Sequence, residues 1–227
     1  MLMNYDFTRS GILAFMCGFI DTIVFVHMGG LFVAHVTGNF VLLGATIVGT
    51  HDTGLHSGTT ILQIATFPVF ILAAFFATLF HDRRPSDDAR LLLWIVAILA
   101  LTAAIWSRLG FAADVGASVI LVCAMATLNA AQRLAPKLGP PTTVMTGNTT
   151  QVAVSLARRW RPAVAPGAEA AALRVPIILV VTFLIGCVLG ALSAYWFGLV
   201  AVALPAAMLI AILATRPGPE AQEGTAI

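Results

Sequence analysis

The chain has 227 residues, of which 59% are hydrophobic and 10% charged, and its formal net charge at pH 7 is +2. Soluble domains carry about 25% charged residues, so the composition excludes a soluble globular protein and indicates an integral membrane protein. We expect the lipid bilayer as a partner and no nucleic acid partner.

Eight hydrophobic segments follow one another along the chain. They cover roughly residues 10–29, 31–49, 60–80, 90–107, 111–134, 141–157, 175–198 and 199–215. A helix that crosses the bilayer needs about 20 predominantly apolar residues. The segments 31–49 and 141–157 fit this requirement poorly, because a Thr-Gly-Asn tripeptide interrupts each of them. The other six segments are the expected crossings.

The placement of the twelve Lys and Arg residues separates two topologies. If all eight segments cross and the N-terminus is inside, these residues divide 7 to 5 between the two sides. If the two interrupted segments instead enter and leave on the same side, the division is 11 to 1, with only Arg108 outside. Because basic residues concentrate on the cytoplasmic side, we predict six crossings with both termini in the cytoplasm.

The two ends of the chain lie outside the expected membrane region. No small-x-small cleavage site follows the first hydrophobic segment, so we expect this segment to be retained. Residues 216–227 lack the apolar content to pack, and we expect them to form a disordered cytoplasmic tail. Residues 1–215 are then a single transmembrane domain.

The two halves of the chain repeat one another. Thr-Gly-Asn occurs at residues 37–39 and again at 146–148. Asp21 precedes the first copy by nearly the same distance at which Asn129 precedes the second, so these two residues are counterparts. Downstream, small residues follow a phenylalanine at one spacing in both halves: Phe70, Ala73 and Ala77, and Phe183, Gly186 and Gly190.

A duplication with three crossings per half must place its second copy upside down in the membrane, an arrangement common among transporters. We therefore predict an all-α integral membrane fold with six transmembrane helices and two re-entrant or broken half-helix segments in an inverted 3+3 repeat. Repeat one covers about residues 1–109 and repeat two about 110–215.

Each tripeptide has the features of a half-helix start. The side chain of Thr37 or Asn39 is suited to cap a helix N-terminus, and Gly38 permits a tight turn. We expect one half-helix from Asn39 towards Val48 and a second that starts at Asn148.

Two half-helices that start near the midplane would bring their dipoles and free N–H groups to one site, which suits an anion or a polar neutral group. This predicts a substrate-binding site composed of Thr37, Gly38, Asn39, Thr146, Gly147 and Asn148. The alternative is that both tripeptides only complete broken helices and contact no solute.

Asp21 lies about ten residues from either end of the first hydrophobic segment. A charge at such a depth costs about 2.5–3.5 kcal/mol on insertion scales, so the side chain should face the bundle interior, and we expect no basic residue at its depth. Asp21 could couple transport to protons, assisted by His35. Its alternative role is a structural acceptor for a Thr hydroxyl or for the Asn39 or Asn129 amide. Asn129 is a further candidate for solute binding, although such amides often connect helices.

Several of these residues occur together in a known family. Gly18-x-x-Asp21, the run from Gly29 to Asn39, Asn129, and Thr143 with Thr146-Gly147-Asn148 resemble the YoaK-like bacterial membrane proteins, a family named for its unknown function. The resemblance covers nearly the whole chain, although Ala126-Thr127-Leu128-Asn129 stands where members often have Gly-Met-Gln-Asn. It implies a multi-pass protein of the bacterial inner (plasma) membrane and supplies no established substrate.

The leading functional hypothesis is transport of a small polar or anionic solute, with proton coupling through Asp21. A passive channel with the same site and a non-transporting membrane scaffold or sensor are the alternatives. We expect no enzyme, cofactor or metal site, because the sequence holds no carboxylate cluster, zinc motif or nucleophile–base spacing at either interface. Gly186-x-x-x-Gly190 suits packing within the chain or between chains, so a homo-oligomer is possible.

Overall fold

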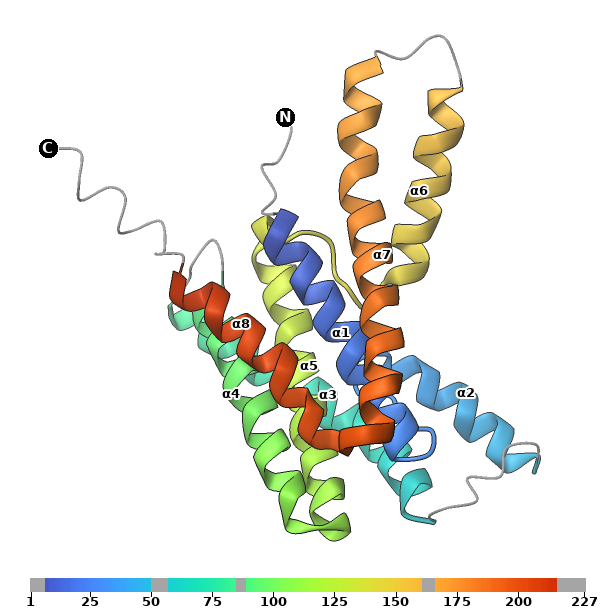
Figure 1. The fold of residues 1–227 in the computed structure, drawn as a ribbon, viewed down its shortest axis with the longest axis vertical. Coiled ribbons are helices and arrows are strands. Elements are labelled where there is room, and N and C mark those ends of the chain that lie inside the picture. Colours follow the sequence, from blue (N-terminus) through green and yellow to red (C-terminus); the bar gives the residue numbers. More distant parts are fainter. Residues whose placement is uncertain (1–6, 50–56, 85–88, 161–165, 216–227) are drawn as a thin grey trace, which may run out of the picture.

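The computed structural model describes residues 7–49, 57–84, 89–160 and 166–215, and the expected tail at 216–227 lies outside these residues. Regular structure in the described part of the chain is helical (Figure 1). The α-helices are α1 (Phe7–His27), α2 (Val36–Ile47), α3 (Ser57–Arg83), α4 (Arg90–Trp106), α5 (Phe111–Leu134), α6 (Met145–Arg159), α7 (Pro166–Phe197) and α8 (Ala203–Thr215). Short 3-10 helices are η1 (Ser107–Leu109), η2 (Pro136–Leu138) and η3 (Gly198–Val202).

Five stretches of the described chain are long and apolar enough to cross a membrane, which is the pattern of a multi-pass membrane protein. Four of them lie in α1, α3, α4 and α5, and the fifth is the 43-residue stretch Leu173–Thr215. The chain reverses direction within this fifth stretch, between α7 and α8 (Figure 1). The reversal starts at Gly198, whose φ of +56° is readily adopted by glycine. α7 and α8 are therefore two separate helices.

α1 and α7 pack with their backbones in contact. A Cβ atom added at Gly18 would lie 2.4 Å from the carbonyl oxygen of Phe183, and one added at Gly186 would lie 2.3 Å from that of Phe15. No side chain fits at these distances, so the helices approach through glycine, as small residues allow in membranes. The glycine motif of the second half thus packs within the chain.

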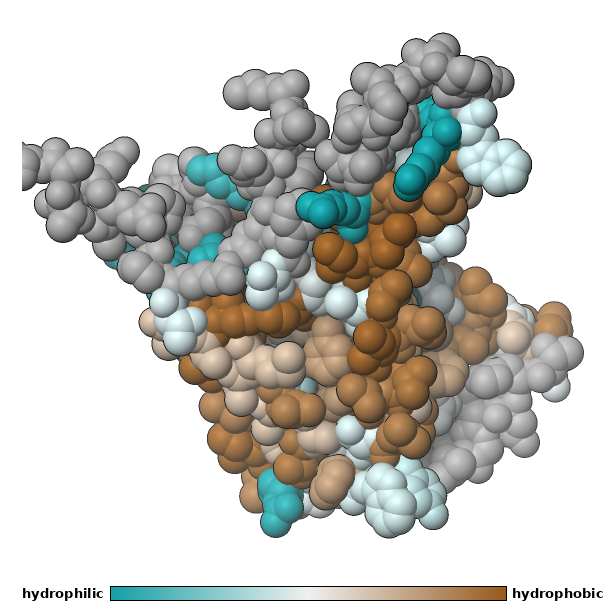
Figure 2. Space-filling view, turned by 45° about the horizontal axis from the view of Figure 1, so that its top comes forward, coloured by the Kyte–Doolittle hydropathy of each residue, from teal (hydrophilic) through white to brown (hydrophobic). Residues whose placement is uncertain are grey.

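The apolar core lies mainly among α1, α4, α5 and α8. α5 packs against α3 and α4, and α4 packs against α8. Fully buried core side chains include Phe19, Ile20, Leu92, Leu121, Met125 and Leu128. Outward-facing side chains are also apolar, among them Phe75, Phe76, Ile98, Leu184 and Val188. Figure 2 shows a broad apolar surface with hydrophilic residues at its margins, as expected for a face that contacts lipid tails.

Two short helices, α2 and α6, extend from the bundle, α2 towards the lower right of the view and α6 towards its top (Figure 1). They have 12 and 15 residues, fewer than the roughly 20 that a crossing needs. α2 packs against α3, and α6 packs against α7. The predicted half-helices are therefore present as short helices.

The starts of these two helices differ from the prediction. α2 begins at Val36 and α6 at Met145, so both tripeptides lie in the first helical turn and not before it. The N-cap residues are His35 and Val144, and neither side chain makes a cap hydrogen bond. The expectation that Thr37 or Asn39 caps α2 is wrong, because the Asn39 side chain bonds to the chain that precedes the helix.

Candidate functional site

The segment between α1 and α2 is unwound, yet side chains bond to three of its carbonyl groups. Met28 O accepts a hydrogen bond from Thr59 Oγ1 (3.1 Å), and Gly30 O accepts one from Gln63 Nε2 (2.7 Å). Phe32 O accepts a third bond, from Asn39 Nδ2 (2.8 Å). Polar side chains of α2 and α3 therefore replace the bonds that a continuous helix would have made.

Side chains also accept bonds from three consecutive amide groups of the same segment. Phe32 N donates to Asn39 Oδ1 (2.9 Å), and the N–H groups of Val33 and Ala34 both donate to Asp21 Oδ1 (2.7 Å each). Since hydrocarbon offers no hydrogen-bond partners, these contacts make the unwound segment between α1 and α2 compatible with a position inside a membrane. Asp21 and Asn39 therefore have a structural role.

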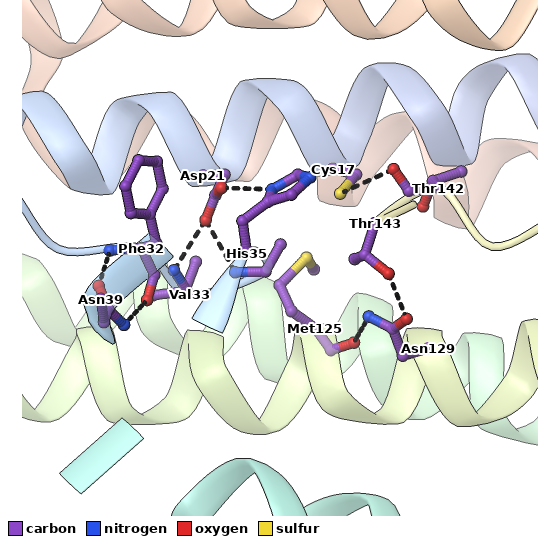
Figure 3. Close-up of polar contacts among 11 residues, drawn as sticks. Cys17, Asp21, Phe32, Val33, His35, Asn39, Met125, Asn129, Thr142 and Thr143 are labelled. Carbon is purple, nitrogen blue, oxygen red and sulfur yellow. Dashed lines mark hydrogen bonds and ion pairs between the residues drawn. The ribbon is translucent and has the colours of Figure 1, made fainter. Parts of the chain in front are cut away.

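Asp21 also pairs with His35. Its Oδ2 atom lies 2.7 Å from His35 Nδ1, and the side chains are 5% and 25% exposed. Figure 3 shows the pair between α1 and α5. The sequence suggested that His35 assists Asp21 but did not predict their contact, which forms because the unwound segment brings His35 back along α1. One carboxylate oxygen thus holds the backbone while the other contacts a group that can carry a proton.

The remaining residues of the first tripeptide differ in their surroundings. Thr37 is exposed. A Cβ atom at Gly38 would lie 2.7 Å from the ring of Phe32, so the glycine lets this ring pack over the start of α2. Asn39 is 0% exposed and also donates to Thr66 Oγ1 on α3 (2.9 Å). Only Thr37 in this copy presents a freely exposed side chain.

The segment between α5 and α6 is held by residues of α5. Gln132 Oε1 accepts bonds from Thr142 N (3.0 Å) and Thr142 Oγ1 (3.1 Å). Asn129, the counterpart of Asp21, accepts a bond from Thr143 Oγ1 at 2.5 Å and donates to Met125 O at 3.3 Å. An amide thus takes the place that a carboxylate has in the first repeat, and no titratable pair results here.

The second tripeptide is less tightly bonded than the first. Asn148 is 8% exposed, and its Nδ2 atom makes a long contact of 3.8 Å with Met145 Sδ. Its Oδ1 atom makes no hydrogen bond to the described residues. Thr146 and Gly147 are exposed. The second copy therefore keeps hydrogen-bonding capacity that the first copy uses internally.

The two unwound segments lie side by side between α1 and α5 (Figure 3). Cys17 of α1 contacts the carbonyl oxygen of Thr142 at 3.9 Å, one helical turn before Asp21. The ring of Phe183 on α7 lies 5.4 Å from that of His35, and Met145 packs against the same small apolar cluster as Phe183. The starts of α2 and α6 therefore both lie against α7 near Phe183.

Some polar residues of this region were not anticipated from the sequence. Gln63, Thr66 and Gln132 complete the two broken segments, and His27 pairs with Asp114 at 2.9 Å. A signal existed, since a buried glutamine within a hydrophobic segment needs a partner. Across the described ranges, no three His, Cys, Asp or Glu side chains are grouped as metal ligands.

Comparison with known proteins gives one match. A family model described as "Protein of unknown function (DUF1275)" matches residues 10–215. No curated protein and no solved structure matches the chain.

Proposed function

The chain belongs to the DUF1275 family, and we propose that it is a membrane transporter of a small polar or anionic solute, coupled to protons through Asp21 and His35. The proposal rests on the 2.7 Å contact of His35 Nδ1 with Asp21 Oδ2, because Asp21 lies within a candidate membrane span. Ionisable residues at such positions are costly and commonly belong to ion or proton pathways. His35 is the more exposed partner of the pair, so we assign to it the contact with the solute path.

The proposed architecture has six crossings in an inverted repeat. It treats α7 and α8 as two crossings and α2 and α6 as re-entrant half-helices. Helix packing supports the duplication, because α1 packs against α7 as α5 packs against α3, and α2 packs against α3 as α6 packs against α7. The start of α1 and the ends of α6 and α8 lie on one side of the molecule (Figure 1), the side we assign to the cytoplasm of a bacterial inner membrane.

The proposed solute contacts are the groups that internal bonding leaves available. They are Thr37, Thr146, Gly147 and the Asn148 amide, together with free N–H groups in the first turns of α2 and α6. Gly38, Asn39 and Asn129 belong to the site as positioning residues, since their packing and hydrogen bonds fix the helix starts. A channel with the same site would conduct without regard to a proton gradient.

A second candidate function is a non-transporting membrane scaffold or sensor. It is favoured by the complete internal bonding of Asp21 Oδ1 and of the Asn39 side chain. In this alternative the polar residues only stabilise a broken helix, and no solute moves.

A solute-flux screen in proteoliposomes, with and without a pH gradient, separates these functions. The intact protein is compared with Asp21→Asn, which keeps an oxygen for the Val33 and Ala34 amides and removes the charge. The matched control is Asp82→Asn, the same change at an exposed position of α3. A transporter shows gradient-dependent flux that Asp21→Asn abolishes and Asp82→Asn preserves. Gradient-independent flux indicates a channel, and absence of flux for every solute supports the scaffold.

A further inference from the structure

Two buried oxygen atoms lack a hydrogen-bond partner among the described residues. They are Gln63 Oε1 on α3 and Ser118 Oγ on α5, and both residues are 0% exposed. A polar atom that is unpaired in an apolar interior is costly, and buried unpaired groups in native proteins often mark a site for an ion or ligand.

The surrounding contacts relate both residues to the end of α1. Gln63 Nε2 donates to Gly30 O, three residues after His27. His27 Nε2 lies 2.9 Å from Asp114 Oδ2 in the first turn of α5, and Ser118 follows one turn later on the same face of that helix. Gln63 thus lies next to the chain that leaves α1, Asp114 contacts the last residue of α1, and Ser118 lies one turn from Asp114 on a helix that packs against α3. We call these three residues with His27 the α1-end cluster.

Asp114 supplies a third oxygen to the α1-end cluster. Its side chain is 10% exposed, and its Oδ2 atom contacts His27 while Oδ1 makes no hydrogen bond to the described residues. His27 is fixed from the other side, since a Cβ atom at Gly198 would lie 3.1 Å from its ring. The cluster therefore offers a carboxylate, an amide carbonyl and a hydroxyl, the oxygen ligands that hard cations prefer. A single carboxylate balances a single positive charge.

We propose that the α1-end cluster binds a small monovalent cation through Gln63 Oε1, Ser118 Oγ and Asp114 Oδ1. The unpaired amide and hydroxyl oxygens then gain a partner, and the cation gains ligands without a second carboxylate. This site is distinct from the Asp21–His35 pair. Its occupancy does not depend on whether the protein moves a solute.

Thermal melting of the purified full chain in detergent tests the site. The probes are NaCl, KCl and NH4Cl against choline chloride at constant ionic strength, because choline is too large for three converging side chains. At least one small cation is expected to raise the melting temperature in proportion to the logarithm of its concentration once the site saturates. Ser118→Ala and Asp114→Asn should remove at least half of this shift.

Two control variants should keep the full cation-dependent rise in melting temperature. Thr78→Val alters a hydroxyl on α3 that bonds only to Ala74 O of its own helix, and Asp21→Asn alters the other buried carboxylate. Equal melting in all four salts overturns the proposal, as does a shift that persists in Ser118→Ala. Ser118→Ala removes only an unbonded hydroxyl, so this variant tests the cation site even if Asp114→Asn does not fold. A cation-dependent rise in melting temperature together with an absence of solute flux would support this cation site and contradict the proposed transport function.

Discussion

Asn39 and Asn148 hold the same position in the two Thr-Gly-Asn tripeptides, but only Asn39 is fully bonded. Asn39 bonds to both backbone groups of Phe32 and to Thr66, whereas Asn148 makes one long contact with Met145 Sδ. The alignment of the two halves proposed above accounts for the difference. It places Pro141, which has no N–H group, opposite Phe32, and the apolar Leu179 opposite Thr66. The first asparagine is committed to the fold, and the second is available to a ligand.

Replacement of Asn39 by Ala should therefore destabilise the protein far more than the same change at Asn148. Asn39→Ala leaves the N–H and C=O groups of Phe32 unpaired, at about 1–3 kcal/mol for each buried group. Asn148→Ala removes only the contact to Met145. Melting temperatures in detergent provide the comparison, and equal losses for the two variants would contradict the difference in bonding.

Asp21→Ala and Asp21→Asn should separate the two roles of this carboxyl group. Alanine removes the acceptor for the Val33 and Ala34 amides and should lower stability by about 2–5 kcal/mol, given the cost of two orphaned donors. Asparagine keeps one oxygen in place and should melt within a few degrees of the intact protein. If both variants melt alike, Asp21 does not hold the unwound segment.

The contact between α1 and α7 predicts a strong response to a single methyl group. Gly190→Ala would place Cβ 2.5 Å from the carbonyl oxygen of Phe19. Overpacking of this kind typically lowers the free energy of unfolding by about 1–3 kcal/mol or more. Gly44→Ala on α2 is the matched control, because nothing lies within 4 Å of its Cβ position. We expect Gly190→Ala to lower the melting temperature and Gly44→Ala to leave it unchanged. Tolerance of alanine there would mean that the two backbones are further apart.

The proposed topology can be checked by thiol labelling in intact cells. Trp160 is 90% exposed at the end of α6, and Leu109 is 73% exposed at the end of η1. In a background without the native cysteines, Leu109→Cys should react with a membrane-impermeant maleimide from outside, and Trp160→Cys should react only after permeabilisation. Labelling of both residues from the same side would exclude the inverted repeat proposed above.

Hydrophobic runs predicted the all-helical, multi-pass character of the fold but less of the site. Five candidate spans lie where long apolar runs were expected to cross, and the two tripeptides marked where helices are interrupted. The exact helix starts at Val36 and Met145 were missed because the bonds that set them come from Asp21, Asn39 and Gln132, at sequence distances that propensity does not report.

The pairing of titratable groups was the least predictable part. The sequence predicted that Asp21 faces the interior, but it did not predict the contact between Asp21 and His35. That contact depends on the reversal of the chain at Gly29 and Gly30, which brings His35 back to Asp21. Both glycines have positive φ, +66° and +111°, so the turn depends on conformations that other residues rarely adopt. His27 and Asp114 are 87 residues apart in the chain, and only the packing of α1 against α5 brings them together.

If the charge on Asp21 couples solute movement to protons, its removal should affect two modes of transport differently. Proteoliposomes with intact protein or Asp21→Asn are assayed for uphill accumulation driven by a pH gradient and for counterflow exchange without one, with the solute that the flux screen identifies. Coupling through Asp21 predicts that Asp21→Asn exchanges solute at a rate near that of the intact protein but no longer accumulates it. Accumulation that survives in Asp21→Asn would show that this charge does not couple transport to protons.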